Sequence, residues 1–459
     1  MPALRVLLIQ PYDPQVPRFL GRVALNPLGL AALAAQTPRG VHISLADENA
    51  GDRINPHVEA DLVAITATTV AAPRAYRLAD AFRAAGKRVI LGGIHPSALP
   101  EEALEHADSV LIGEAEGIWP RVLDDFPRLE ASYRAAARPS LAGLPWPRRD
   151  LFRSHGLPTM ETSRGCPFNC EFCCSTIHFG ESCRQRPIEE VVAELSYLKS
   201  QGADRVFFTD DNIVGQPARA KQLFSALAPL GMEWIGQGSI SIARDPELMA
   251  LARASGCLLL LIGFESLSAG NLHDMGKRVN RAEEYHHQVR ALHRHGIGII
   301  GCFVFGFDGD DPGVFERTLA FYQQAHIDVP QVTVLTPYPG TRLRARLLEQ
   351  ERIFEHRWSS YDATSVVFRP LQMTARQLAE GFRNLTRRLY RSDYVLWRLL
   401  GRYWESAARL PLERIYRYWI TTQGYRQVIT KQRVLWGHRP AQPSIAFSKM
   451  GSSVTSAIR

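Results

Sequence analysis

The segment Arg164-Gly165-Cys166-Pro167-Phe168-Asn169-Cys170-Glu171-Phe172-Cys173 places three thiols in one short stretch, directly after a segment with an extended pattern. The spacing is Cys-x3-Cys-x2-Cys. Three thiolates from one loop can bind three irons of a cubane 4Fe-4S cluster, whereas a structural zinc site normally needs a fourth protein ligand at a matched spacing. No second Cys-x2-Cys pair and no His-x3-His motif is present to complete a zinc site. We therefore expect Cys166, Cys170 and Cys173 to ligate a 4Fe-4S cluster with one open iron; a zinc knuckle, or unrelated buried thiols, is the alternative.

This motif resembles the cluster-binding loop of the radical S-adenosylmethionine (SAM) enzymes. The resemblance implies that the open iron takes the amino and carboxylate groups of SAM, and that an electron from the cluster cleaves SAM to a 5′-deoxyadenosyl radical. It also implies that Phe172 lies beside the adenine. Cys174 directly follows a ligand and is predicted not to bind the cluster. Cys257 and Cys302 lie in apolar strand patterns, where cysteine behaves as a small hydrophobic residue.

With 459 residues, the chain is long enough for two or three domains. Its longest purely apolar run, Leu258–Ile262, is far shorter than the ~20 residues that cross a bilayer. The N-terminus begins with a strand pattern and shows no charged region followed by a cleavable apolar segment. Seven cysteines, an odd number with three in one loop, favour a reducing cytoplasm over a disulfide framework.

Residues 1–130 alternate short β patterns with helical patterns. The predicted strands are 5–9, 43–46, 62–66, 88–91 and 109–112, and the predicted helices are 28–35, 73–85 and 101–106. Such alternation is typical of a parallel, doubly wound, Rossmann-like sheet, whose ligands bind beyond the carboxyl ends of the strands. The turns at these ends are rich in small residues, which let a bulky ligand approach the backbone. These turns are 66–69, 92–96 and 113–116.

Three short motifs in this part of the chain are Asn26-Pro27-Leu28-Gly29-Leu30, Gly92-Gly93-x-His95-Pro96 and Gly113-Glu114-x-Glu116. Together they resemble the cobalamin-binding domain that precedes many radical SAM domains. The resemblance implies that cobalamin lies at the strand ends, and the residues expected to contact it are Thr68, Gly92, Gly93, Gly113 and Glu114. The chain has no Asp-x-His-x-x-Gly motif, so no His ligand to cobalt is predicted, and His95 is expected to be a turn residue at a helix start. A domain that has kept the fold and binds nothing is the alternative.

Residues 131–157 contain Pro139, Pro145 and Pro147 and are predicted to be a linker. From residue 158 to 345, strand and helix patterns alternate again. The predicted strands are 159–162, 205–209, 233–238, 258–263, 297–305 and 331–335. Six βα units match the open, partial (β/α)6 barrel of the radical SAM fold. A helix is expected from Pro187, and Asp245-Pro246 and Asp311-Pro312 predict two further helix starts.

Polar residues follow the strands predicted for this barrel. Asp211 follows the second strand, Gln237 and Ser239 the third, and Glu265 the fourth. In the radical SAM family, the end of the second strand contacts the SAM amino group, and later strand ends contact the ribose and the carboxylate. The resemblance therefore implies that these four residues bind SAM. For each one, the alternative is a solvated loop residue or a helix cap.

Residues 346–459 are predicted to form a mostly helical, basic and aromatic-rich region. Residues 374–459 carry 16 Lys and Arg against 4 Asp and Glu, a balance of +12, so the first 373 residues carry about −4 of the net +8. The catalytic part thus has no general nucleic-acid-binding character. The basic segment also contains Tyr390, Tyr394, Trp397, Tyr403, Trp404, Tyr416, Tyr418, Trp419 and Trp436. Arg beside Trp and Tyr suits a membrane surface, so the segment either packs on the barrel as a helical subdomain or contacts the inner face of the membrane peripherally.

The resemblances together imply a cobalamin-dependent radical SAM enzyme, with a C-methyltransferase acting on an unactivated carbon as the first interpretation. The implied cofactors are a 4Fe-4S cluster, SAM and cobalamin, and the implied partners are a small-molecule or lipid-like substrate and an electron donor such as flavodoxin or ferredoxin. A cyclisation, oxidation or ring rearrangement without methyl transfer is the alternative. Transfer-RNA methylthiolation is disfavoured because those enzymes carry three more cluster-binding cysteines near the N-terminus, whereas the first cysteine here is Cys166. A non-catalytic iron-sulfur scaffold or cobalamin sensor would not need the polar strand ends.

Overall fold

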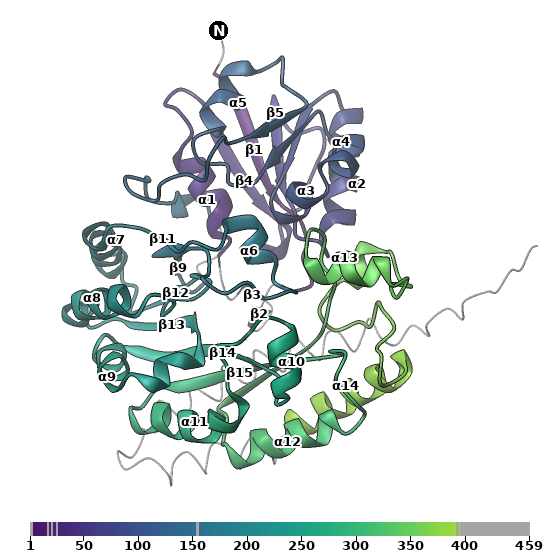
Figure 1. Cartoon of the computed structure of the whole chain (residues 1–459). Helices are drawn as coiled ribbons and strands as arrows, with labels where there is room; N and C mark the ends of the chain where they lie inside the picture. The colour runs from purple at the N-terminus through teal and green to yellow at the C-terminus, as the bar shows by residue number, and fades with distance from the viewer. Residues whose placement is uncertain are drawn as a thin grey trace, which may run out of the picture.

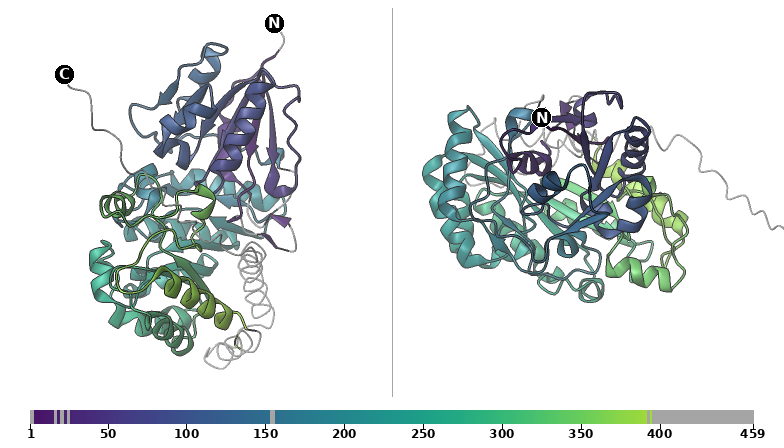
Figure 2. Two further views of the ribbon diagram at one scale, coloured as in Figure 1. Left: turned by 90° about the vertical axis from the view of Figure 1, so that its right-hand side faces the viewer. Right: turned by 90° about the horizontal axis from the view of Figure 1, so that it is seen from above.

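The computed structural model describes residues 3–15, 18–19, 22–23, 26–152, 156–391 and 394. Two α/β units lie one above the other (Figure 1), with the N-terminal unit above a partial barrel. Figure 2 shows the same arrangement from the side. The six-stranded sheet of each unit is parallel throughout, so the fold class predicted from the sequence is confirmed for the described part of the chain.

The N-terminal unit contains a six-stranded sheet in the order β4-β1-β5-β6-β7-β8. Its strands are β1 (Arg5–Gln10), β4 (His42–Asp47), β5 (Leu62–Thr66), β6 (Arg88–Gly92), β7 (Ser109–Ile112) and β8 (Ser132–Arg134). Its helices are α1 (Leu28–Ala35), α2 (Ala72–Ala84), α3 (Ile94–Ala98), α4 (Pro100–His106) and α5 (Trp119–Asp125). Five strands and three helices match the prediction. The sequence predicts a helix start at His95 without bounds for α3, and it does not predict α5 or β8, because each of these elements buries at most three side chains in a segment too short to show a period.

Strand residues of this sheet alternate between two apolar layers. Leu8 and Ala64 pack with α1 and α5 on one face, whereas Ile9 and Val63 pack with α2 and α4 on the other. Helices therefore cover both faces, which explains why the strands are near-continuous apolar runs. The faces of the sheet are therefore covered, and a ligand is expected at the carboxyl ends of the strands.

The second unit has the strand order β16-β15-β14-β13-β12-β9, and β9 and β16 form two edges that are not paired with each other. The strands are β9 (Thr159–Met160), β12 (Arg205–Phe208), β13 (Glu233–Gly238), β14 (Cys257–Glu265), β15 (Gly298–Phe305) and β16 (Val329–Val334). The outer helices are α7 (Ile188–Ser200), α8 (Pro217–Leu227), α9 (Pro246–Ala254), α11 (Tyr285–Arg294) and α12 (Val314–Gln324). Shorter elements of this unit are the antiparallel pair of β10 (Ser163–Arg164) and β11 (Arg184–Gln185) and the helices α6 (Cys174–Phe179) and α10 (Ala269–Asp274). A second short antiparallel pair, β2 (Arg18–Phe19) with β3 (Arg22–Val23), lies near the start of the chain. The predicted open barrel is confirmed.

The barrel has a small apolar cluster in its interior, separate from the large core beneath the outer helices. Leu259, Ile300 and Val329 form this interior cluster, and Cys302 packs against it. Cys257 is fully buried in the outer core. Both cysteines therefore serve as small hydrophobic residues, as predicted.

The three predicted helix starts have different outcomes. The carboxylate of Asp245 accepts a hydrogen bond from the Leu248 amide at 3.0 Å and caps α9, as predicted. The Asp311 carboxylate accepts from the Gly313 amide at 2.7 Å and so holds the turn before α12, which begins only at Val314. Pro187 has an extended backbone and precedes the first turn of α7 instead of lying in it.

Two helices follow the barrel, α13 (Arg342–Glu349) and α14 (Ala375–Leu389), and the boundary expected at residue 345 falls within α13. Tyr390 is buried and Tyr394 packs against the barrel core, as the helical-subdomain interpretation expects of them. The rest of the basic, aromatic segment, residues 395–459, lies outside the described residues. No helix in the described part of the chain is long and apolar enough to cross a membrane.

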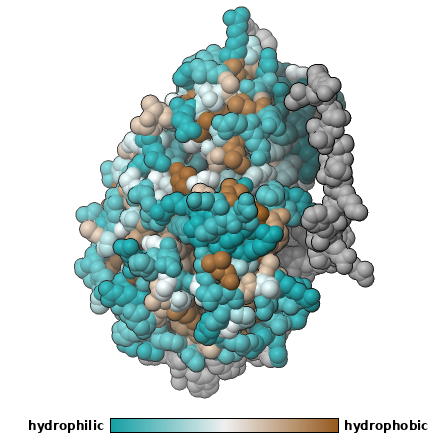
Figure 3. Space-filling view, turned by 45° about the vertical axis from the view of Figure 1, so that its right-hand side comes forward, coloured by the Kyte–Doolittle hydropathy of each residue, from teal (hydrophilic) through white to brown (hydrophobic). Residues whose placement is uncertain are grey.

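Figure 3 shows a face on which hydrophilic residues predominate and hydrophobic ones lie in small, separate patches.

The segment after the barrel contacts both the cysteine loop and the N-terminal unit. The guanidinium of Arg346 donates to the Glu171 carboxylate at 2.6 Å and to the Asp308 carboxylate at 2.5 Å. The indole of Trp358 donates to the Glu102 carboxylate on α4 at 2.8 Å, and its ring lies 5.0 Å from that of the buried His95. His95 lies in the first turn of α3, as expected.

Candidate active site

The cysteine loop, residues 165–173, runs from β10 to α6. Gly165 has a positive φ of 91°, and a Cβ there would lie 2.4 Å from the Ser182 carbonyl oxygen, so only glycine fits. Its amide donates to the Asp211 carboxylate at 2.9 Å. The Cys183 thiol donates to its carbonyl at 3.3 Å. The backbone beside Cys166 is therefore held from both sides.

Cys170 is buried, whereas Cys166 and Cys173 are partly exposed. Burial raises the pKa of Cys166, and raises that of Cys170 to about 11. Close by, Lys277 donates to the Glu265 carboxylate at 2.6 Å. Burial acts to lower the pKa of Lys277, but the charge of Glu265 outweighs it and holds this pKa above its ordinary value.

No three His, Cys, Asp or Glu side chains among the described residues converge closely enough to ligate one metal ion. A cubane cluster makes a different demand, because each thiolate binds its own iron and the thiolates are spread around the cluster. The three thiols of one loop suit that arrangement.

The predicted SAM-binding residues lie around this loop in different environments. The ring of Phe172 packs 6.1 Å from that of Phe307. Gln237 alternates with buried residues of β13 and shares the barrel-interior face with Ile235. The Ser239 hydroxyl accepts from the Ser241 amide and caps a short helical turn, which is the cap alternative stated above.

Asn212 is a site residue that was not singled out from the sequence. Its side-chain amide nitrogen lies 4.0 Å from the Cys166 sulfur, and its oxygen accepts from the Ser239 amide at 3.0 Å. It therefore links the cysteine loop to the end of β13. The signal that could have found it was its place in the Asp210-Asp211-Asn212 strand end.

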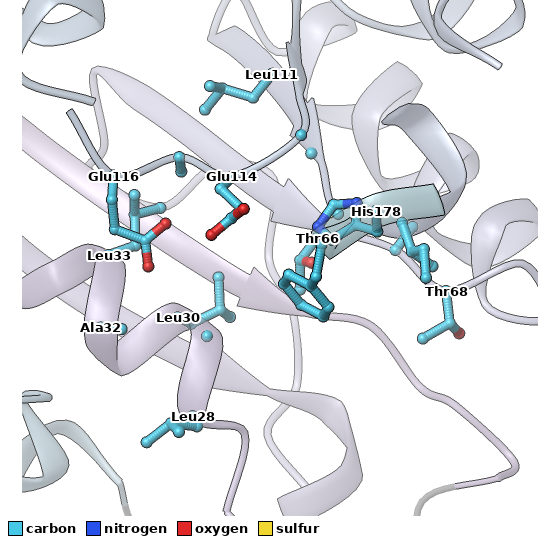
Figure 4. A pocket seen from close by; sticks show the side chains of 18 of the residues that line it. Leu28, Leu30, Ala32, Leu33, Thr66, Thr68, Leu111, Glu114, Glu116 and His178 are labelled. Carbon is cyan, nitrogen blue, oxygen red and sulfur yellow. The ribbon is translucent and has the colours of Figure 1, made fainter. Parts of the chain in front are cut away.

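A cavity of about 510 Å³ lies between the carboxyl ends of the N-terminal strands and the barrel. All five residues expected to contact cobalamin line it, namely Thr68, Gly92, Gly93, Gly113 and Glu114, and Asp211 lines it from the barrel side. Figure 4 shows Leu28, Leu30, Ala32 and Leu33 of α1 along one side of this cavity. Together with Ile90 and Leu111, these residues make much of the cavity wall apolar.

The polar side chains that line this cavity mostly form hydrogen bonds with other residues of the protein. The Thr68 hydroxyl donates to the buried Asp13 carboxylate at 2.6 Å, and Glu114 accepts from Arg164 at 2.7 Å. His178, on α6, also lines the cavity, and burial lowers its pKa. Arg164 and His178 were not predicted to line a site, since nothing in their spacing relates them to the N-terminal strand ends.

A second cavity, of about 380 Å³, adjoins the first and shares Ile94, Glu114 and His178 with it. Ala98, Ile177 and Pro339 add apolar surface. Cys174, beside the cysteine loop, lines this cavity. Both cavities are thus lined in part by α6.

Comparison with known proteins agrees with this architecture. Residues 160–322 match the radical SAM superfamily, and residues 23–123 match the B12 binding domain. The chain is 34% identical over 411 residues to bacteriochlorophyllide d C-12(1)-methyltransferase of Chlorobaculum tepidum, which covers 86% of this chain and 89% of that protein. The chain belongs to the radical SAM enzymes with a B12-binding domain. The cofactors of these enzymes are a 4Fe-4S cluster, SAM and cobalamin, as the sequence implied.

More distant relatives of this B12-binding radical SAM enzyme include the hopanoid C-2 methylase of Rhodopseudomonas palustris, 24% identical over 345 residues, or 72% of this chain and 65% of that protein. Among solved structures, cobalamin-dependent SAM radical enzyme OxsB, with aqua-cobalamin and SAM bound, has a TM-score of 0.65 at 14% identity, covering 96% of this chain and 74% of OxsB. The methyltransferase TsrM of Kitasatospora setae, with cobalamin and a 4Fe-4S cluster bound, has a TM-score of 0.63 at 18% identity, covering 83% of this chain and 85% of TsrM. At these identities, the two structures establish a common fold.

Proposed function

We propose that this enzyme is a C-methyltransferase that adds a methyl group to an unactivated carbon of a small, largely apolar substrate. The observation that carries the proposal is the position of Asp211. Its carboxylate holds the Gly165 amide beside Cys166, and the same residue lines the large cavity at the N-terminal strand ends. The cluster loop and the proposed cobalamin cavity therefore share a wall, as a reaction that uses both cofactors on one carbon requires.

A separate set of residues would bind each cofactor. Cys166, Cys170 and Cys173 would ligate the cluster, and Phe172, Asp211, Gln237, Ser239 and Glu265 would bind SAM. Thr68, Gly92, Gly93, Gly113 and Glu114 would form the wall facing cobalamin. The mainly apolar wall suits the aromatic base of the cobalamin nucleotide, and the polar groups in it suit the amide groups of the corrin.

When bound, the cluster with SAM supplies the radical, and cobalamin supplies the methyl group. The protein's part is to position these groups and to keep water away from them. Leu30, Leu33 and Leu111 exclude water from the large cavity, and Ile94 and Ile177 do so where the second cavity begins.

The second cavity is the proposed entrance for the substrate, because it joins the large cavity at His178 and reaches Cys174 beside the cluster loop. Its walls combine apolar groups, such as Ile94 and Ile177, with the cationic side chains of Arg134 and Arg138. The relatives named above act, by name, on bacteriochlorophyllide d and on hopanoids, which are rigid ring systems with large apolar surfaces. A rigid, polycyclic or lipid-like substrate is therefore the proposed class.

Methyl transfer is tested with SAM that carries an isotopic label in its methyl group. Enzyme reconstituted with iron, sulfide and hydroxocobalamin under anaerobic conditions, and reduced by flavodoxin or ferredoxin, would be offered bacteriochlorophyllide d and a hopanoid as probes. We expect 5′-deoxyadenosine and a product heavier by one labelled methyl group. Formation of 5′-deoxyadenosine with an unlabelled product would instead indicate a cyclisation, oxidation or rearrangement, and failure to cleave SAM would contradict a radical mechanism.

The proposed electron donor, a small protein such as flavodoxin or ferredoxin, could approach the cluster loop where Pro167 and Asn169 are exposed. We also propose that the basic segment binds an anionic membrane surface peripherally through residues 395–459, since α14 and Tyr390 pack in the barrel core, and so gives access to a lipophilic substrate. Co-sedimentation with anionic liposomes should then occur at low salt, weaken at high salt and disappear when these residues are removed. Equal amounts of protein in the supernatant with and without liposomes would contradict membrane binding.

A further inference from the structure

The guanidinium of Arg164 lies where the B12-binding unit meets the cluster loop, and it bonds to three carboxylates. It donates to Glu114 at 2.7 Å and to Glu116 at 2.5 Å, both in the turn after β7. It also donates to Glu161 at 2.6 and 2.9 Å, next to β9 of the barrel. Only 9% of its side chain is exposed. One side chain thus joins the carboxylates of both units.

A second arginine reinforces this contact. Arg184 donates to both oxygens of Glu114, at 2.5 and 3.0 Å, and to the Pro139 carbonyl at 2.7 Å. Arg164 and Arg184 are directly opposed in the antiparallel hairpin of β10 and β11. The hairpin therefore presents two cations side by side to Glu114, whose side chain is 3% exposed. Figure 4 shows Glu114 and Glu116 close together in the cavity wall.

The charges of this network make Arg164 its central member. The network contains three carboxylates and two guanidinium groups. Among the ion pairs of the described residues, Glu116 and Glu161 each pair with Arg164 alone. Removing the Arg164 cation would leave largely buried carboxylates facing one another, which is strongly unfavourable. A lysine would keep the charge but could not span three carboxylates, because its ammonium lacks the planar fork of arginine.

Arg164 also lies only two residues before Cys166, in a backbone that cannot bend freely. Gly165 is fixed by Asp211 on one side and Cys183 on the other. The Cys166 amide, in turn, donates to the Gly180 carbonyl at 3.4 Å. The cysteine loop therefore has a fixed position in the barrel, and the contacts of Arg164 with Glu114 and Glu116 fix where the B12-binding unit lies relative to it.

We infer that Arg164 is a positioning residue that sets the separation between the cluster and the cobalamin cavity, with Glu114 and Glu116 as its anchors on the B12-binding unit. This inference rests on the proposed function, since it takes the cysteine loop and the large cavity as the two cofactor sites. Glu114 then serves mainly to hold Arg164 in place, from its position in the cavity wall. Misplacement of a reacting group by about 1 Å can lower a rate about a hundredfold, so a loosened network should separate radical formation from methyl transfer.

The test uses Arg164→Gln in the full chain, reconstituted with both cofactors. Pulsed electron paramagnetic resonance (EPR) measures the distance between the reduced cluster and cob(II)alamin, and needs no substrate. We expect a narrow distance distribution for the parent enzyme and a shifted or broadened one for Arg164→Gln and Arg164→Lys. Arg205→Gln is the matched control, because Arg205 is also paired with a carboxylate, Glu233, at 2.8 Å, but at the amino ends of β12 and β13, away from both proposed cofactor sites. It should lower stability without changing the distance.

A second readout follows the ratio of 5′-deoxyadenosine to methylated product. This ratio should rise about tenfold or more in Arg164→Gln while cluster content stays at the parent level. If Arg164→Gln does not fold, Glu116→Gln removes a single anchor and should shift the same distance by less. An unchanged distance in a variant that holds both cofactors would overturn the inference and leave the proposed function standing. A parent enzyme that retains no cobalamin would overturn both.

Discussion

Replacement of Cys170 by alanine is expected to abolish both the 4Fe-4S cluster and SAM cleavage. Cys170 is one of only three thiolates proposed to hold the cluster, and its side chain is buried beside the Lys277–Glu265 pair. Iron and sulfide content, the visible absorption of the reconstituted protein and 5′-deoxyadenosine formation measure the effect.

Cys174→Ala is the control for this experiment. Cys174 adjoins the loop but begins α6 and is predicted not to ligate the cluster, so the variant should reconstitute normally. Cleavage of SAM by Cys170→Ala at the parent rate would contradict the assignment of the three ligands. Loss of the cluster in Cys174→Ala alone would show that the wrong cysteine had been assigned.

Filling the apolar part of the large cavity is expected to prevent cobalamin binding. Ala64, on β5, lines the cavity, clusters with Leu30, Ile90 and Leu111, and is 5% exposed. In Ala64→Phe, the aromatic ring would occupy the space proposed for the nucleotide base. Cobalamin retained after desalting should fall from about one equivalent to a small fraction, because the ring and the nucleotide base cannot occupy the same space; the overpacking should also lower the free energy of unfolding by about 1–3 kcal/mol. The cluster, in the other unit, should form as before and SAM cleavage should persist.

Val63→Ala is the matched control for the cavity variant. Val63 precedes Ala64 in β5 but points to the opposite face of the sheet, against α2 and α4. Its truncation should lower the free energy of unfolding by about 1 kcal/mol or more without changing cobalamin retention. Retention of a full equivalent by Ala64→Phe would place cobalamin elsewhere and contradict the proposed site.

Much of this fold could be predicted because the strands are near-continuous apolar runs between helices. The β13 strand, Glu233–Gly238, and the α1 helix, Leu28–Ala35, match the prediction at both ends. Residues at strand ends, such as Thr68 and Gly93, could be predicted to line a cavity because parallel strands bring their carboxyl ends to one edge of the sheet. These inferences need only local pattern and the rules of parallel sheets.

The remaining features depend on contacts between distant parts of the chain. Arg164 and Glu114 lie 50 positions apart, and no period in the sequence relates them. The hydroxyl of Ser239 could contact SAM or cap a turn, and only the structure shows that it accepts from Ser241. Strand β8 buries a single side chain, Tyr133, which is too little for a recognisable pattern. Patterns locate elements, whereas these choices depend on tertiary packing.

The segment that follows the barrel limits how this enzyme could exchange parts with its relatives. Arg346 joins it to the cysteine loop through Glu171, and Trp358 joins it to the B12-binding unit through Glu102. A chimaera that received a new N-terminal unit alone would lose the partner of Trp358, and the contacts of Arg164 would have to be rebuilt as well. Natural recombination or engineering should therefore succeed best when the N-terminal unit, the β10–β11 hairpin and residues 342–361 are inherited as one set.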